Sequence, residues 1–408
     1  MNEKTSNTYI VSPRWLITCD SDSQVLENHS LLIDNGIIAA ILSEQQLQTH
    51  RSSQTTEVLE LPDHALMPGM INAHGHLAMS LFRGLADDKP LQSWLEEDIW
   101  PAEGRWVDEQ FVRDGTELAM AEMLLSGTTT CSDMYFFPEV CASVASDIGM
   151  RLQIAFPILD FPTAWGQGPD DYISKGSVLH DEYRDHEYVS VAFGPHAPYT
   201  VAEPVLNRIA SMVNEIDAAV QIHVQETLAE LQDFRRNHGL TPIEKLAELG
   251  LLSPKTQCVH LVHLGDNDAT LLAEHNAHAI HCPQSNLKLA AGFSPVSDLS
   301  KSGVNVALGT DSAASNNALD MFQEMKTAAL IAKASSVDAK AVPAEEALKM
   351  ATINGAKALG IAHKTGSLEV GKAADMIAIN TAKPRLNPIY DIVSQKTRHY
   401  LNIFHHFL

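Results

Sequence analysis

Hydrophobic and polar positions follow two different patterns along the 408-residue chain. Between residues 9 and 61, short stretches rich in aliphatic residues are separated by Asp, Asn and Gly turns, which is typical of a small antiparallel sheet. From residue 65 on, short apolar runs are spaced by amphipathic stretches of helical periodicity. This second pattern indicates repeated βα units around a parallel sheet. The sequence therefore predicts a small β unit joined to a larger α/β unit.

Eight apolar runs carry the predicted parallel strands. They are ALMPGMINAHGH (65–76), GTTTCSDMY (127–135), RLQIAFPI (151–158), VSVAFGPHAPY (189–199), AAVQIHVQET (218–227), QCVHLVHL (257–264), AHAIHCPQS (277–285) and VNVALGTDSAAS (304–315). Helical patterns lie between or after them, for example over 203–216 and 321–334. Eight βα units favour a closed (β/α)8 TIM barrel, and an open doubly wound sheet is the alternative.

The segment after the barrel completes the predicted organisation. Residues 345–360 have a helical pattern, and residues 366–380 return to strand character with Gly turns. We expect this late strand to pair with the N-terminal strands. The predicted domains are a small β-sandwich of residues 1–64 and 365–408 and a barrel of residues 65–364.

Charge and composition narrow the classes of function. The formal net charge of −23 opposes binding of nucleic acid, because a phosphate backbone is bound by a basic surface. Five cysteines without a CxxC pair indicate neither a disulfide framework nor a thiolate zinc site. There is no apolar leader and no run of about 18 apolar residues that would span a membrane. We expect a cytoplasmic protein that acts on a small molecule.

Titratable residues lie at the C-terminal ends of several predicted strands, at the barrel face where reactive groups lie. His74 and His76 are two positions apart on an extended strand, so both can face one ion. His223 closes the fifth strand and Asp311 the eighth. Taken singly, each histidine could be a core residue and Asp311 a helix cap. Together, three imidazoles and one carboxylate suit zinc or iron(II) and leave room for a water whose pKa the metal lowers.

Five ordered motifs resemble the amidohydrolase superfamily. They are PGMINAHGH, GPHAPY, QIHVQET, HCPQSNLKL and LGTDSAASNN. Over residues 9–393 the chain is most similar to the methylthioadenosine/S-adenosylhomocysteine deaminases and their triazine hydrolase relatives. Binuclear relatives carry a carboxylated lysine at the end of the fourth strand, where this chain has His196 and no lysine. The resemblance thus implies one divalent metal, zinc or Fe²⁺, held by His74, His76, His223 and Asp311.

The resemblance also implies catalytic and substrate-binding residues. Glu226 is similar to the acid that protonates the ring nitrogen, and an exposed loop glutamate is the alternative. His260 is similar to the histidine that works with Asp311 to direct the water and to deliver a proton to the leaving ammonia. Glu103 is similar to the carboxylate that accepts the ribose hydroxyls, and His196 to a histidine that contacts the substrate. The implied substrate-binding set is Glu103, His196, Glu226 and Asp311.

The implied reaction is hydrolytic deamination of an adenine nucleoside. Related enzymes can carry an arginine on the loop after the third strand, where this chain reads AFPILDFPTAWGQG. Its absence argues against an arginine clamp for the carboxylate of S-adenosylhomocysteine and favours 5′-methylthioadenosine, with an apolar pocket near Phe156, Phe161 and Trp165 for the methylthio group. S-adenosylhomocysteine and adenosine are the other candidate substrates. The alternatives are a triazine chlorohydrolase or guanine deaminase on the same scaffold, against which Glu226 argues, and an inactive metal-binding scaffold.

The C-terminal tail departs from the family pattern after about Ser394. Family members continue there through further strands, whereas this chain reads VSQKTRHYLNIFHHFL over residues 393–408. We expect a small domain that is short of strands. Its exposed edges would invite pairing with another subunit, so a homo-oligomer is expected.

Overall fold

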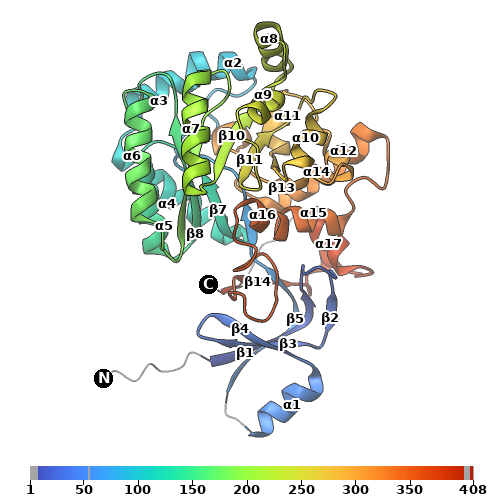
Figure 1. Ribbon diagram of the computed structural model, residues 1–408. Helices are drawn as coiled ribbons and strands as arrows, with labels where there is room; N and C mark the ends of the chain where they lie inside the picture. Colours follow the sequence, from blue (N-terminus) through green and yellow to red (C-terminus); the bar gives the residue numbers. More distant parts are fainter. Residues whose placement is uncertain (1–7, 54–55, 399–404, 408) are drawn as a thin grey trace, which may run out of the picture.

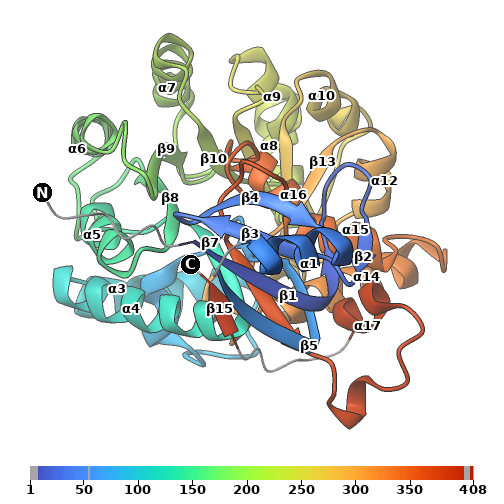
Figure 2. The ribbon, with the colours of Figure 1, turned by 90° about the horizontal axis from the view of Figure 1, so that it is seen from below.

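The computed structural model describes residues 8–53, 56–398 and 405–407. The expectations for residues 1–7 and for residues 399–404 and 408 of the tail therefore lie outside the described residues. The described chain forms a barrel with a smaller sheet at one end (Figure 1). Seen along the barrel, the strands of this sheet lie across its end (Figure 2).

Eight strands form the barrel, and each pairs in parallel with its neighbours. They are β6 (Met70–Asn72), β7 (Thr128–Asp133), β8 (Arg151–Ile158), β9 (Val189–Pro195), β10 (Val220–Val224), β11 (Thr256–His260), β12 (His278–His281) and β13 (Asn305–Leu308). The first and last strands meet where the Ala73 N–H donates to the Leu308 carbonyl at 2.9 Å. The predicted (β/α)8 barrel is confirmed.

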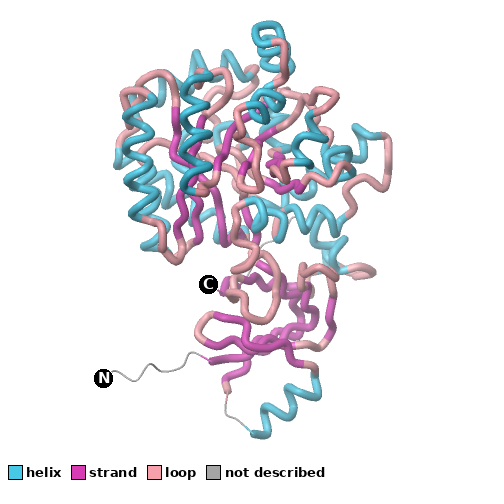
Figure 3. The backbone as a smooth tube through the Cα atoms, viewed as in Figure 1, coloured by secondary structure: helices cyan, strands magenta, loops and turns pink. Residues whose placement is uncertain are grey.

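Helices surround the barrel on its outside (Figure 3). In chain order after β6, the helices are the following, with η1 and η3 of 3₁₀ type and η2 of π type: η1 (Leu77–Phe82), α2 (Leu91–Trp94), η2 (Leu95–Ile99), α3 (Trp100–Trp106), α4 (Glu109–Ser126), α5 (Pro138–Ile148), α6 (Pro169–Glu182), α7 (Glu203–Ile216), α8 (Leu228–His238), α9 (Pro242–Glu248), α10 (Asp268–Glu274), α11 (Pro283–Lys288), α12 (Val296–Lys301), α13 (Ala313–Asn316), α14 (Met321–Ser336), α15 (Ala344–Met350), α16 (Ile353–Ala358), η3 (Pro384–Leu386) and α17 (Ile392–Arg398). The predicted helix over 203–216 coincides with α7. It buries Leu206, Ile209, Ala210 and Val213, the spacing of one helix face.

The predicted helix over 345–360 is two helices, α15 and α16. The chain leaves helical geometry at Thr352, where φ is −133° and ψ is −101°. The preceding carbonyl, that of Ala351, accepts the N–H of Ile71, in β6, at 2.8 Å. This bond to the barrel takes the place of the next bond along the helix, so a tertiary contact interrupts a locally helical sequence.

The small sheet contains seven strands in the described chain. They are β1 (Thr8–Ile17), β2 (Val25–Glu27), β3 (Ser30–Asp34), β4 (Ile37–Leu42), β5 (Glu57–Pro68), β14 (Met376–Asn380) and β15 (His405–Phe407), with α1 (Glu44–Ser53) between β4 and β5. The predicted antiparallel sheet is mixed, because β1 pairs in parallel with β5. The late strand β14 pairs with β5, as predicted. The domain limits at residues 64 and 365 remain a prediction, and β5 runs past the first of them.

An ion pair joins the two parts at the start of β8. Arg151 Nε lies 2.6 Å from Asp375 Oδ2, and both side chains are largely buried. Since β8 starts at Arg151, the small sheet meets the barrel at the N-terminal ends of its strands. The C-terminal ends, where barrel enzymes place their reactive groups, lie at the opposite side. Among the described residues, no helix combines the length and the apolar character needed to cross a membrane.

Candidate metal centre and active site

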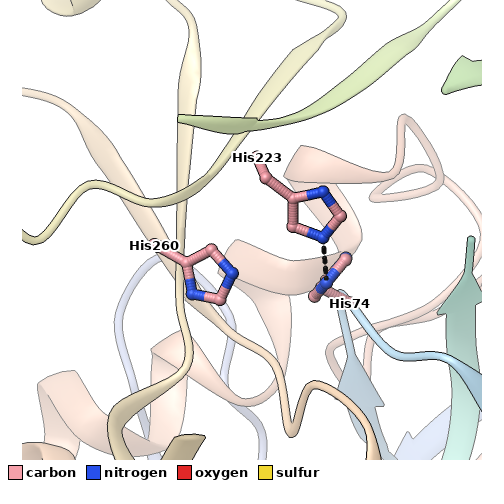
Figure 4. Close-up of side chains that lie close together, drawn as sticks. All are labelled: His74, His223 and His260. Atoms are coloured by element: carbon pink, nitrogen blue, oxygen red, sulfur yellow. Dashed lines mark hydrogen bonds between the residues drawn. The ribbon is translucent and has the colours of Figure 1, made fainter. Parts of the chain in front are cut away.

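Three histidines and one aspartate meet at the C-terminal ends of β6, β10 and β13. The Nε2 atoms of His74 and His223 lie 3.1 Å apart. Asp311 Oδ1 lies 3.2 Å from His76 Nε2 and 3.6 Å from His74 Nε2. Figure 4 shows the His223 ring directed at His74, with His260 beside them. Possible ligand atoms of His74, His76 and Asp311 all lie within 4.8 Å of one another, as do those of His74, His223 and His260.

The three histidines use Nδ1 for their hydrogen bonds to the protein, so their Nε2 atoms face the space between them. The Nδ1 of His76 lies 2.5 Å from the Met134 carbonyl, and that of His223 lies 2.7 Å from the His196 carbonyl. A carbonyl only accepts, so both Nδ1 atoms carry the proton. His74 Nδ1 lies 2.8 Å from Gln221 Oε1, which accepts in the same way. Burial lowers the pKa of His74 and of His223, which keeps these rings neutral. Burial lowers the pKa of His76 too, but the hydrogen bond and charge of Asp311 outweigh it and raise this pKa to about 8, so a metal would displace a proton from His76. Three Nε2 atoms that converge beside a carboxylate fit a divalent metal ion.

Asp311 is held in its ionised form by hydroxyl and amide donors. Its Oδ2 accepts from Ser285 Oγ at 2.6 Å and from Ser315 Oγ at 3.0 Å, and its Oδ1 accepts the Ser312 N–H at 2.8 Å. Burial raises the pKa of Asp311, but the hydrogen bonds of His74 and His76 and the charge of His76 outweigh it, so this pKa lies well below its usual value. Asp311 therefore presents an anionic oxygen to the three histidines.

Glu226 and His260 face each other beside the metal centre. Glu226 Oε2 lies 3.7 Å from His260 Nε2. Burial raises the pKa of Glu226 to about 8, and the charge of Asp311 adds to this effect. His260 Nδ1 is bonded to Asn286 Oδ1 at 3.0 Å, and burial lowers the pKa of His260. A protonated carboxyl and a neutral imidazole suit proton donation and proton acceptance at neutral pH.

A cavity opens over these groups. Of the sequence-predicted site residues, it is lined by His76, Glu103, His196, His223, Glu226, His260 and Asp311, while His74 is fully buried beneath it. Glu103, on α3, accepts the Tyr135 hydroxyl at 2.8 Å, and burial raises the pKa of Glu103 to about 7. His196 Nδ1 is bonded to Thr200 Oγ1 at 2.9 Å. All eight predicted residues thus belong to one site.

The sequence model of the Amidohydrolase family matches residues 65–401. The chain belongs to the amidohydrolase family. The predicted enzyme class, a hydrolase of carbon–nitrogen bonds, is confirmed. The chain is 52% identical over 394 residues to a protein of Saccharophagus degradans named 5-methylthioadenosine/S-adenosylhomocysteine deaminase, covering 97% of this chain and 88% of that protein.

Two solved structures are similar to this amidohydrolase. An adenosine deaminase from Xanthomonas campestris with bound zinc has a TM-score of 0.95 and 39% identity, over 98% of this chain and 91% of that one. An atrazine chlorohydrolase from Arthrobacter aurescens, complexed with zinc, has a TM-score of 0.88 and 23% identity, over 95% of this chain and 91% of that one. This second likeness shows the shared fold.

The apolar wall of the amidohydrolase cavity differs from the predicted one. Phe161 lines the cavity, and its ring centroid lies 6.0 Å from that of Trp100. Phe156 instead points to the helix layer, where it packs against Phe193 and leaves no room for a Cβ at Gly176 of α6. Trp165 is buried away from the cavity and donates to Glu139. The prediction was therefore wrong for Phe156 and Trp165.

Several residues that hold the site were not predicted. Gln221 precedes His223 by two positions, and side chains two apart on a strand point to the same side, so this signal was present in the sequence. Ser285 and Asn286 lie in the motif HCPQSNLKL and bond Asp311 and His260. Tyr135 follows the second barrel strand, at the face where reactive groups lie, and bonds Glu103.

Proposed function

We propose that this amidohydrolase is a metal-dependent hydrolytic deaminase of adenine nucleosides. The observation that carries the proposal is the buried Glu226 carboxyl, 3.7 Å from His260 and in one cavity with the cluster of histidines and Asp311. One divalent ion, zinc first and Fe²⁺ second, would be held by His74, His76, His223 and Asp311. When bound, such an ion lowers the pKa of a water toward neutrality and so supplies a nucleophile at neutral pH.

The residues of the chain then handle the protons of the reaction. Glu226 donates its proton from the carboxyl to the ring nitrogen next to the amino-bearing carbon. His260 and Asp311 hold the attacking water and take its proton. The same two residues return that proton to the amino group, which leaves as ammonia. The hydroxyl group added from water then gives its proton to the Glu226 carboxylate, so the ring becomes a hypoxanthine and Glu226 regains its proton. The 3.7 Å between Glu226 Oε2 and His260 Nε2 allows the two to contact the same reacting ring.

Glu103 and His196 orient the nucleoside. The carboxylate of Glu103 has two acceptor oxygens, which suit the vicinal hydroxyls of a ribose. The Tyr135 hydroxyl fixes one of these oxygens, so the carboxylate is already oriented before the ligand binds. His196 lines the same cavity and contacts the bound substrate. Such fixed contacts to non-reacting groups place the ring against Glu226.

The charge of the cavity favours methylthioadenosine as the substrate. Among the described residues, no Lys or Arg lines the cavity, whereas Glu103, Glu226 and Asp311 do. Nearby Lys288 is bound to Asp87, at 2.6 Å. A carboxylate on the 5′ substituent finds no partner there, whereas a methylthio group can pack against Trp100 and Phe161. We therefore place 5′-methylthioadenosine first, adenosine second and S-adenosylhomocysteine third.

A substrate panel tests this proposal. The zinc-loaded protein is assayed for ammonia release from the three nucleosides and guanine, and for chloride release from a chlorotriazine. The highest kcat/KM is expected for methylthioadenosine. Equal efficiency on S-adenosylhomocysteine would contradict the assignment of the 5′ subsite, and preference for guanine or the triazine would contradict the nucleoside assignment. Zinc binding without any turnover would indicate an inactive scaffold.

A further inference from the structure

Glu226 reaches the cavity without a side-chain hydrogen bond to hold it. Within the described chain, its closest ionic partner is His260 at 3.7 Å, beyond hydrogen-bond distance. Its side chain is nevertheless buried. The direction of this carboxyl is therefore set by the backbone that carries it, and the residues that fix that backbone determine where the proton is delivered.

The backbone turns sharply just before Glu226. Gln225 has a φ of 55°, in the left-handed region that a residue with a Cβ adopts at a cost. Its buried side chain donates to the His263 carbonyl at 2.5 Å and to Asp268 Oδ2 at 2.8 Å. The side-chain oxygen accepts the Ile243 N–H at 3.1 Å. These bonds keep Gln225 in the turn and anchor it to the loop after β11 and to the start of α9.

Glu230, in the first turn of α8, forms hydrogen bonds with the same backbone segment. Its Oε1 accepts the N–H of Gln225 and its Oε2 accepts the N–H of Glu226, both at 2.9 Å. The Thr227 hydroxyl in turn accepts the Glu230 N–H at 3.2 Å. A carboxylate that accepts with both oxygens from two successive amides fixes both peptide planes at once. Glu230 thereby couples the helix to the turn that aims Glu226.

The comparison with α9 shows that this arrangement is more than helix capping. There Glu244 occupies the equivalent third position, and its carboxylate accepts the N–H of the helix cap Thr241 at 2.7 Å. This is the usual reciprocal capping arrangement. Glu230 also interacts with the N–H of its own cap, Thr227, but its two 2.9 Å bonds go to the two residues before that cap, which lead into the active site.

We propose that Glu230 is a positioning residue for deamination, which aims the Glu226 carboxyl by holding the N–H groups of Gln225 and Glu226. The inference rests on the proposed function, because it assigns Glu230 a task only if Glu226 donates the proton. Glu230 does not line the cavity and does not contact the substrate. Its loss therefore affects the reaction step more than binding.

Glu230→Gln is the test variant, and Glu244→Gln is its matched control. A glutamine at position 230 has one acceptor oxygen, so its NH₂ group opposes one of the two backbone N–H donors. We expect kcat on methylthioadenosine to fall at least about tenfold, with KM changed less than about threefold, because small displacements of a reacting group lower the rate steeply. The metal content is expected to stay that of the wild type. Glu244→Gln is expected to retain the wild-type kcat.

Glu230→Asp extends the test. It keeps the carboxylate but shortens the side chain, so its kcat is expected to lie between those of wild type and Glu230→Gln. A kcat of Glu230→Gln equal to that of Glu244→Gln would overturn the inference. If circular dichroism shows that Glu230→Gln does not fold, a wild-type kcat for Glu230→Asp would overturn the inference instead. An inactive wild-type protein would contradict the proposed function itself, so the two failures are distinguishable.

Discussion

Replacement of Gln221 by Leu tests how the barrel interior prepares the metal centre. Gln221 is fully buried, and its Oε1 accepts the Nδ1 proton of His74 at 2.8 Å. Its amide nitrogen donates to Gln257 Oε1 at 2.6 Å and to the Ala73 carbonyl at 3.1 Å. The glutamine thus fixes the His74 tautomer whose Nε2 lone pair faces His223. A leucine of similar size removes the acceptor and preserves most of the packing volume.

The expected magnitude follows from the groups that lose their partners. Without Gln221, His74 can carry its proton on Nε2, where it competes with a metal. Loss of such an outer partner costs about 10- to 100-fold in metal affinity. Four buried groups, His74 Nδ1, Gln257 Oε1, Ser132 Oγ and the Ala73 carbonyl, also lose a bond, at about 1–3 kcal/mol each. We therefore expect the stability of the metal-free protein to fall by at least about 4 kcal/mol.

Two measurements separate these effects. The zinc Kd is obtained by competition with a chromophoric chelator, and the stability of the metal-free protein by urea denaturation. The control is Gln153→Leu, in the same barrel interior, because Gln153 is buried, makes one long 3.5 Å bond to the Leu359 carbonyl and contacts no proposed ligand. Zinc affinity within twofold of wild type for Gln221→Leu would refute the reasoning, as would an equal loss of affinity in the control.

Three further predictions concern the acid and the junction between the two parts. Glu226→Gln is expected to lower kcat by about 10²-fold or more with the metal retained, because a side-chain amide is too weak an acid to donate a proton to the ring. Unchanged turnover would contradict the acid role. The raised pKa of Glu226, about 8, keeps it protonated at neutral pH, so kcat should fall as the pH rises through that value. A bound cation lowers this pKa, which places the fall at or below about pH 8, and a rate that rises there would contradict it. Arg151→Met leaves the buried Asp375 unpaired and should cost about 3–5 kcal/mol in urea denaturation, whereas Arg208→Met, at an exposed pair, should cost little.

The proposed metal ligands could be predicted from the sequence for a geometric reason. In a parallel barrel every strand ends at the same face, so the order of the strands is enough to bring His74, His223 and Asp311 together. Two residues on one strand, such as His74 and His76, share a direction because the strand repeats every two residues. Neither inference needs knowledge of side-chain packing.

Features that depend on packing between distant segments were harder to predict from the sequence. One face of strand β8 meets helix α6 and the opposite face points into the barrel. The sequence did not indicate that Phe156 lies on the face that meets α6. Trp100 lies in the segment before α4, which has no strand periodicity to place it. The helix is interrupted at Thr352 because the N–H of Ile71, far away in the chain, donates a hydrogen bond to the Ala351 carbonyl. The reach of Glu230 beyond its helix cap likewise follows from the turn at Gln225.

The products formed from 5′-methylthioadenosine test the central claim most directly. The zinc-loaded protein is incubated with this nucleoside, and ammonia and the purine products are quantified together. The account predicts one ammonia for each molecule of the hypoxanthine nucleoside, with the 5′ substituent and the ribose bond intact. Release of free adenine, or no turnover by zinc-loaded folded protein, would contradict it.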